Sequence, residues 1–159
     1  MQPSFFLDVK QYLEYSVSDF STFLEKYQGK KKVGDVTLAE LCAVEGAPNG
    51  LYFFFDDEDV LWYVGKATSR SFIERISSHF DQREDAWFAT LPRKIKAICE
   101  IAQYRDAHAL ALTLRLVILG IQEKERSIRL ETTFRSCLGP KLNSNQKHKS
   151  DCEKKLRDV

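Results

Sequence analysis

The sequence predicts a single α+β domain in which helices pack around a small three-stranded antiparallel sheet. Two β-prone runs joined by an acidic turn, at residues 51–64, predict a hairpin. Apolar residues that alternate over residues 109–121 predict the third strand. Helical spacings of three and four on both sides of these runs favour helices that cover the sheet. The chain of 159 residues is long enough for one such domain with its own core, and too short for two.

Composition says little about function. The formal net charge is +1, so charge alone does not indicate a nucleic-acid binder. No apolar run approaches the roughly 20 residues of a membrane span, and the N-terminus lacks the basic start of a secretory signal. Because the cysteines are widely spaced, we expect thiols in a reducing compartment, and hence a cytoplasmic protein. The four cysteines are Cys42, Cys99, Cys137 and Cys152.

Residues 1–49 are expected to form a helical extension before the sheet. Apolar residues at helical spacings run from residue 5 to residue 27, with a capping box at Ser16 between the two halves. A second capping box at Thr37 starts a short helix, which the Gly46–Gly50 segment ends. The aromatic residues of this extension need cover from water, so we expect its helices to pack on one face of the hairpin or to extend the core beside it. That face carries Phe53, Phe55, Val60 and Trp62.

The hairpin has its turn at Asp56–Asp59, between the runs Leu51–Phe55 and Val60–Val64. A symmetric register about this turn places Tyr52 directly opposite Tyr63 on one face. The other face is apolar along both strands and must be buried. The acidic turn then lies at the end of the hairpin remote from both tyrosines.

Further helices are expected on either side of the third strand. Ser71 opens one with capping-box spacing, and its apolar stripe leaves Arg75 and His79 together on another face. A second covers residues 91–102, with Pro92 in its first turn. The last covers residues 123–138 and stops at Gly139-Pro140. Its expected core contacts are Ile128, Leu130, Phe134, Cys137 and Leu138.

The third strand is the least distinctive element, because the Ala and Leu content of residues 109–121 also suits a helix. Residues 83–108 before it are interpreted as a helical insertion. The core therefore spans residues 50–143. Residues 144–159 form a polar tail that we expect to fray.

Motifs in this core resemble those of the GIY-YIG nucleases, in the same order along the chain. Gly50-Leu51-Tyr52 and Tyr63-Val64-Gly65-Lys66 are similar to the paired tripeptides that name the family. The run Tyr-Val-Gly-Lys-Ala, followed later by Glu-Arg-Ile-Ser-Ser-His-Phe, is especially similar to the nuclease module of the bacterial excision-repair incision subunit.

Two later motifs complete the resemblance. Arg75 and His79 look like the family's helix, in which a polar residue follows an Arg by one turn. Glu131, Pro140 and Asn143 resemble its closing motif. The distance from Tyr63 to Arg75 is about two residues longer than is usual for the family, so a longer loop must bring in the arginine.

The resemblance implies a metal-dependent endonuclease that hydrolyses phosphodiester bonds in nucleic acid, with DNA as the expected substrate. Tyr52 would activate the attacking water, and Tyr63 would position it or a phosphate oxygen. A free tyrosine has a pKa of about 10, so its ionisation at pH 7 costs about 4 kcal/mol unless a neighbour lowers that pKa. Lys66, at the end of the same strand as Tyr63, is the natural neighbour.

The remaining roles follow from the same resemblance. Arg75 would hold the scissile phosphate, with His79 as a further catalytic candidate. Glu131 would hold one Mg²⁺ or Mn²⁺, with phosphate and waters completing its shell. Asn143 would hold the loop after the last helix, and with Lys66 and Arg75 it makes up the expected substrate-binding set. Such a site needs its residues in one cleft, with Glu131 on the side of the sheet that carries Tyr52.

Each of these residues also has a purely structural interpretation. The two tyrosines suit a cross-strand aromatic pair, and Lys66 suits a solvated strand end. Arg75 has Glu74 and Asp81 as surface partners, and His79 suits an exposed helix position. Glu131 suits an i,i+4 pair with Arg135, worth only about 0.3–0.5 kcal/mol. His108 and His148 have no partners at metal spacing.

Two classes of function remain open. The expected polar positions are all filled, which favours an active nuclease. The alternative is a catalytically inactive GIY-YIG-like module that binds nucleic acid or a protein. The near-neutral charge favours weak DNA binding, so that a protein partner or a homodimer supplies specificity. No membrane partner is expected.

Overall fold

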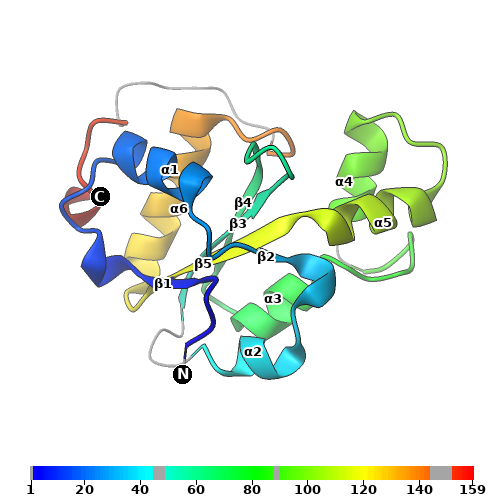
Figure 1. Cartoon of the computed structure of the whole chain (residues 1–159), viewed down its shortest axis with the longest axis horizontal. Helices are drawn as coiled ribbons and strands as arrows, with labels where there is room; N and C mark the ends of the chain where they lie inside the picture. The colour runs from blue at the N-terminus through cyan, green and yellow to red at the C-terminus, as the bar shows by residue number, and fades with distance from the viewer. Residues whose placement is uncertain (1, 45–48, 88–89, 144–151) are drawn as a thin grey trace.

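The structure is a computed structural model that describes residues 2–44, 49–87, 90–143 and 152–159. At its centre lies a mixed five-stranded sheet in the order β1-β5-β3-β4, with β2 paired to the start of β5 (Figure 1). β3 runs antiparallel to β4 and to β5, whereas β1 runs parallel to β5. The strands are β1 (Phe6–Asp8), β2 (Lys31–Lys32), β3 (Asn49–Phe55), β4 (Leu61–Ala67) and β5 (Arg115–Ile121). The α+β class is confirmed. The predicted three-stranded sheet is its β4-β3-β5 part, which β1 and β2 extend.

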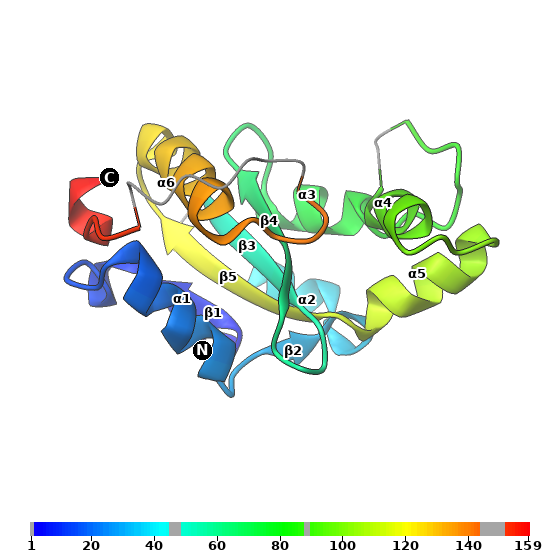
Figure 2. The same ribbon diagram turned by 90° about the horizontal axis from the view of Figure 1, so that it is seen from above.

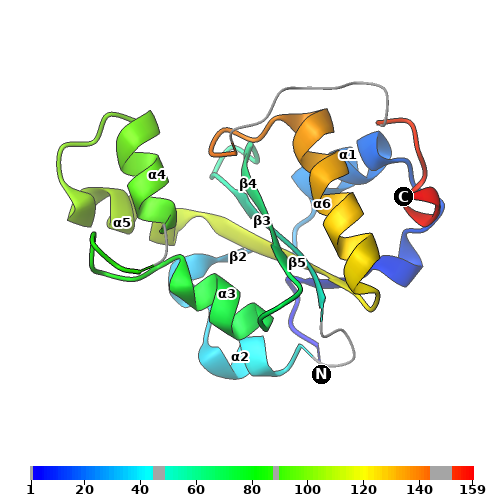
Figure 3. The same ribbon diagram turned by 180° about the vertical axis from the view of Figure 1, so that it is seen from behind.

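Helices cover both faces of this sheet. Helices α1 and α6 lie on one face, and α2, α3, α4 and α5 lie on the other (Figures 1 and 3). In the described residues they are α1 (Val17–Lys26), α2 (Leu38–Cys42), α3 (Phe72–Ser78), α4 (Leu91–Ile98), α5 (Tyr104–Thr113) and α6 (Lys124–Leu138). None of them is both long and apolar enough to cross a membrane.

The side chains of β3 alternate between two separate hydrophobic layers. Phe53 packs edge-on against Phe134 of α6 at a ring distance of 5.3 Å, in the layer that also holds α1. Tyr52 and Phe54 point into the layer beneath α3, α4 and α5. The expectation that the N-terminal segment covers the Phe53 face is confirmed for α1. It is wrong for Val60, which is half exposed, and for Trp62, which packs in the other layer.

The N-terminal helix predicted over residues 5–27 is correct only in its second half. Helix α1 begins after Ser16, whose side chain accepts a hydrogen bond from the Asp19 amide at 3.0 Å. Before it, Phe6–Asp8 form a strand and Val9–Gln11 a 3₁₀ turn. This strand forms because residues 118–120 offer it a parallel partner, more than 100 positions away, that local spacing cannot reveal. The first 49 residues are therefore more than a helical extension, since they add two strands to the sheet.

The hairpin forms, but its register is shifted by two residues. Tyr52 lies opposite Gly65, and Tyr63 lies opposite Phe54, with an irregularity between Phe54 and Phe55. The Asp56 carboxylate explains the shift, because it accepts from the amides of residues 58 and 60 at 2.9 Å and so closes an asymmetric turn. Because the shift is even, both tyrosines stay on the predicted face.

The segment predicted as the third strand divides into two elements. Helix α5 runs to Thr113, and β5 begins only at Arg115. Ala107 and Ala111 are fully buried, because α5 packs closely on α4. Helix α4 begins as predicted with Pro92 in its first turn, but ends at Ile98. Helix α6 agrees with its prediction and ends at Gly139 with φ of 53°, although Ile128 is partly exposed.

The C-terminal residues 152–159 pack against the domain instead of fraying. Leu156 is fully buried, and its amide donates to the Tyr15 carbonyl at 2.9 Å. Cys152 forms a disulfide with Cys137 of α6, with Cα atoms 5.5 Å apart. The expectation of four thiols is thus wrong for this pair and correct for Cys42 and Cys99. The predicted fraying at residues 144–151, and most of the Gly46–Gly50 break, lie outside the described residues.

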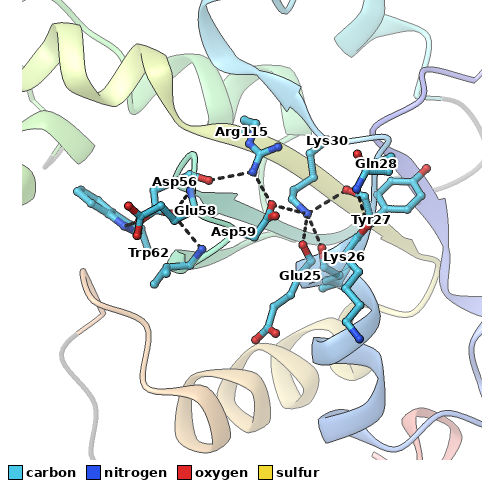
Figure 4. A network of polar contacts seen from close by, with 12 residues as sticks. Glu25, Lys26, Tyr27, Gln28, Lys30, Asp56, Glu58, Asp59, Trp62 and Arg115 are labelled. Atoms are coloured by element: carbon cyan, nitrogen blue, oxygen red, sulfur yellow. Dashed lines mark hydrogen bonds and ion pairs between the residues drawn. The ribbon is translucent and has the colours of Figure 1, made fainter.

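A buried lysine joins α1 to the tip of the hairpin (Figure 4). The Lys30 ammonium donates to the carbonyls of Leu24, Glu25 and Tyr27 at the end of α1, at 2.7–2.9 Å. The Leu24 carbonyl also accepts the Tyr27 amide. It also pairs with Asp59 at 3.1 Å. Asp59, with φ of 62°, accepts from Arg115 of β5 as well. Within the acidic turn, Asp59 is therefore paired with two cations from different elements.

Candidate active site

The predicted site residues meet at the outer edge of the sheet, where β4 is the last strand. Tyr52 comes from β3, Tyr63 and Lys66 from β4, Arg75 from α3, and Glu131 from α6. Helices α3 and α6 cover opposite faces, and β4 lies between them (Figure 2). The expectation that Glu131 starts from the Tyr52 side of the sheet is therefore wrong. Its carboxylate nevertheless reaches the same cavity past the edge strand.

The Tyr52 ring lies across the backbone of β4 at Gly65. A Cβ atom at residue 65 would stand 2.3 Å from the ring of Tyr52, so only glycine leaves room for it. Gly50 at the start of β3 has φ of 153°, and a Cβ there would stand 2.2 Å from the Leu119 carbonyl oxygen. Both motif glycines are thus explained by close packing of the three central strands.

Tyr52 is enclosed by polar partners from α3. Its hydroxyl lies 2.7 Å from Nε2 of His79, the residue that caps α3, and 3.5 Å from an Arg75 nitrogen that donates to it. His79 is buried, not exposed, and among the described residues its Nδ1 has no hydrogen-bond partner. Burial, with the charges of Arg75 and Lys94, lowers the pKa of His79 to about 3. Its ring is therefore neutral at physiological pH.

Glu131 is held between two cations. One carboxylate oxygen accepts from Lys66 at 2.7 Å, and the other accepts from Arg135 at 3.2 Å. The Glu131 side chain is only 7% exposed, so this pair is far better shielded than a surface i,i+4 pair. Glu131 therefore pairs with Arg135, as in the structural interpretation, and it also lies in the cavity with other predicted site residues.

A cavity of about 220 Å³ opens between these groups. Four of the predicted residues line it: Tyr63, Lys66, Arg75 and Glu131. Tyr52 and His79 lie behind its wall, with Tyr52 fully buried. Asn143 does not line it, since its amide bonds to both the N–H and the carbonyl of Val64 and so fastens the chain after α6 to β4.

Sequence reasoning missed part of this wall. Thr68, Ser69 and Arg70 also line the cavity, on the loop that brings in Arg75. The available signal was their position directly after the Tyr-Val-Gly-Lys motif. Lys94 of α4 was missed as well: its ammonium lies 4.8 Å from the centre of the Tyr63 ring. Its signal was the basic run Arg93-Lys94-Ile95-Lys96.

Residues 48–119 match the family model of the UvrC-like GIY-YIG domain. Over this stretch the chain is similar to a GIY-YIG domain. The resemblance found in the sequence is thereby confirmed for the two tyrosine motifs and the Arg75 helix. The match ends before α6, so the place of Glu131 rests on the geometry of the cavity. No curated protein and no solved structure matches the chain significantly.

The two tyrosines of the GIY-YIG motif differ in access to the cavity. Burial raises the pKa of Tyr52 well above its ordinary value, and its hydroxyl faces His79 and Arg75. Burial also raises the pKa of Tyr63, although the charges of Arg75 and Arg135 oppose that rise. The expectation that Lys66 is the main charge acting on the motif tyrosines is not supported, because Lys66 pairs with Glu131. Tyr63 is the tyrosine that reaches the cavity.

The residues of this cavity fit a hard divalent cation bound by one carboxylate. Among the described residues, no group of three or more His, Cys, Asp or Glu side chains is arranged to hold a metal by itself. Glu131 is the acidic residue in the cavity wall. A Mg²⁺ ion that keeps several waters and gains phosphate oxygens needs only one or two protein carboxylates. These residues therefore fit a metal ion whose remaining ligands are waters and phosphate oxygens.

Proposed function

We propose that this chain is a metal-dependent endonuclease that hydrolyses phosphodiester bonds in nucleic acid, with DNA as the expected substrate. One observation carries the proposal: a phenol, a guanidinium and a carboxylate from three separate elements line one cavity in a domain similar to a GIY-YIG domain. Convergence of an acid–base group, a phosphate-binding group and a metal ligand is what hydrolysis of a phosphodiester requires.

Two of these residues would bind the substrate and its metal. Arg75 would place its planar pair of donors on the scissile phosphate. Glu131 would hold one Mg²⁺ or Mn²⁺ ion, which supplies Lewis-acid stabilisation of charge on the phosphate when bound. Lys66 would keep the Glu131 carboxylate oriented, given the 2.7 Å contact between them.

We assign the proton transfer to Tyr63 and not to Tyr52. Tyr63 in its phenolate form would take a proton from water while the water oxygen bonds to phosphorus. The bond from phosphorus to the departing strand oxygen breaks, and that oxygen takes a proton from solvent. Tyr52 is fully buried and does not line the cavity, which supports Tyr63 as the group next to the attacking water. Its contact with Arg75 makes it a positioning residue.

One feature favours the second candidate function, a catalytically inactive module that binds nucleic acid. Both oxygens of Glu131 are occupied by cations, so a metal must compete with Lys66 and Arg135 for the carboxylate. In that case the cavity holds a phosphate without cleaving it. A protein partner or a second copy of the chain supplying specificity would suit either function, because the net charge is only +1.

Nicking of supercoiled plasmid separates the two functions. We expect nicked circles to accumulate with Mg²⁺ or Mn²⁺ and none in chelator, while gel-shift binding persists in chelator. Binding without nicking at any concentration of either metal supports the inactive module instead. A panel of duplex, branched and single-stranded DNA and RNA then identifies the substrate.

A further inference from the structure

Lys94 of helix α4 is a cation beside the site, and it belongs to none of the family motifs. The Lys94 ammonium lies 4.8 Å from the centre of the Tyr63 ring, within the range of a cation–π contact. In Figures 2 and 3, α4 and α6 stand on either side of β4. Lys94 belongs to α4, whereas Glu131 and Arg135 belong to α6. Positive charge therefore acts on Tyr63 from both helices, through Lys94 and Arg135.

The part of α4 that carries Lys94 is anchored by neighbouring elements. Leu91 and Ile95 of α4 are fully buried, and the Leu91 amide donates to the His79 carbonyl at 3.1 Å. The Thr90 hydroxyl, at the start of α4, contacts the Tyr104 hydroxyl of α5 at 2.8 Å. The helix that carries Lys94 is therefore tied directly to His79, the residue that contacts Tyr52.

The surroundings of Lys94 are electrostatically unfavourable for a cation. It is half-buried and forms no ion pair with an acid anywhere in the described part of the chain. Burial, with the charges of Arg135 and Arg75, lowers its pKa. The acid of the cavity wall, Glu131, is already shared between Lys66 and Arg135. Positive charge exceeds negative charge around Tyr63, and an anion would relieve the repulsion.

We propose that Lys94 binds a second phosphate of the nucleic-acid strand, next to the phosphate that Arg75 holds. This inference rests on the proposed function, because it extends the same site along the strand. A lysine suits this role, since its ammonium is a point charge that accepts a phosphate at many angles, whereas the scissile phosphate needs the planar fork of Arg75. The strand would then be held by phosphates on both sides of Tyr63.

Binding in chelator tests this subsite without any catalysis. The probe is a fluorescent duplex of about 30 base pairs, titrated over a series of salt concentrations. We expect Lys94→Met to bind about tenfold more weakly at low salt, and the slope of log affinity against log salt to fall by about 0.9. Lys94→Arg, which keeps the charge, should bind like the wild type. Lys26 is exposed on α1, which packs on the face of the sheet opposite α4. Lys26→Met loses the same charge there and should change neither the affinity nor the salt slope.

Steady-state nicking separates phosphate binding from an effect on Tyr63. A flanking phosphate is bound equally before and during the reaction, so Lys94→Met should raise KM about tenfold and leave kcat within about twofold. A fall in kcat with unchanged KM and unchanged salt slope would overturn the subsite and make Lys94 a residue that positions Tyr63. Unchanged binding by Lys94→Met, with normal nicking by the wild type, overturns the subsite alone. A wild type that binds with this Lys94 dependence but never nicks overturns the nuclease function alone.

Discussion

The two motif tyrosines have the same side chain but different environments. Tyr52 lies over Gly65 with its hydroxyl against His79, sealed from the cavity. Tyr63 lies on the next strand with its ring beside Lys94 and part of its surface in the cavity wall. Burial raises the pKa of both, so neither is a phenolate at neutral pH without a cost. Access, more than acidity, therefore decides which of them can take a proton from water.

The raised pKa of Tyr63 predicts an alkaline pH profile. Below that pKa the phenolate fraction grows tenfold for each pH unit, so the nicking rate at saturating metal should rise by up to about tenfold per unit between pH 7 and 9. Tyr63→Phe should reduce nicking by at least about a hundredfold. Tyr52→Phe keeps a ring over Gly65 and should lose less. The assignment is wrong if Tyr63→Phe nicks at the wild-type rate while Tyr52→Phe does not.

Buried His79 predicts a loss of stability in mild acid. The unfolded histidine binds a proton below pH about 6.5, whereas the folded ring binds one only near pH 3. The stabilisation is thus complete above pH 6.5 and declines as the pH falls towards 3, with about 1.4 kcal/mol lost by pH 5.5. Urea unfolding of His79→Gln should show a flatter dependence between pH 7 and 5.5. An equal slope for His79→Gln and the wild type would contradict the assignment.

At the scale of elements, the hairpin tip is fastened by a side chain of another element. Lys30 follows α1, yet its ammonium pairs with Asp59 in the β3–β4 turn, and Arg115 of β5 joins the same carboxylate (Figure 4). The Lys30 side chain is 1% exposed, so its charge depends wholly on these partners. Lys30 and Asp59 thus connect the end of α1, the β3–β4 turn and the central strand β5.

Lys30→Met should therefore destabilise the fold. The variant keeps the length of the side chain but removes the ammonium from three carbonyl oxygens at the end of α1, of which that of Leu24 keeps a second donor, the Tyr27 amide. We expect a loss of about 2–4 kcal/mol in the free energy of unfolding, measured with urea. Lys26→Met, at an exposed position of the same helix, should stay within about 0.5 kcal/mol of the wild type. Equal stability of the two variants would show that the network contributes nothing.

Elements with local signals were predictable from the sequence. The capping boxes at Thr37 and Ser71 form with both of their hydrogen bonds, and Gly139 ends α6 in the left-handed conformation. Elements that depend on distant partners were not predictable. Residues 6–8 carry helical spacing but pair with β5, and Ala107 and Ala111 belong to a helix because α4 offers a close surface. Local pattern cannot show which surface a segment will meet.

At the scale of the whole molecule, the C-terminal residues fasten the outer layer of helices. Residues 152–159 lie against the start of α1 and are joined to α6 through the Cys137–Cys152 disulfide (Figure 1). Ser16 and Lys155 form an isolated β-bridge there. Charge and polarity predicted a frayed tail, because the single buried Leu156 is too weak a signal among eight mostly polar residues.

Leu156→Ala should show how much this segment stabilises the domain. The side chain is fully buried in the layer beneath α1 and α6, so its truncation should cost about 2–4 kcal/mol in urea unfolding. Asp158→Ala, at an exposed position of the same turn, should be nearly neutral. A neutral Leu156→Ala variant would mean that the segment contributes little to the packed core.

The sequence predicted which residues form the site better than it predicted how the elements bring them together. Motif order placed Tyr63, Lys66, Arg75 and Glu131 together, and the cavity is lined by all four. The sequence could not show that the site straddles an edge strand, since that depends on α6 and α3 covering opposite faces. Asn143 holds the loop after the last helix, as expected, but it does so on β4 and does not line the cavity. The place of Lys94 beside Tyr63 was missed because it depends on how α4 packs.

The central claim is that Glu131 holds a catalytic metal, and Glu131→Gln tests it most directly. The variant removes one charge with little change of shape, so we expect Mg²⁺-dependent nicking to fall at least about a hundredfold, or about 2.7 kcal/mol of transition-state stabilisation. Binding of the same DNA in chelator should hold or tighten, because an anion near phosphate has gone. Glu125→Gln, exposed at the start of α6, should nick like the wild type. Near-wild-type nicking by Glu131→Gln across a range of Mg²⁺ concentrations would contradict the claim and leave Glu131 as a structural partner of Lys66 and Arg135.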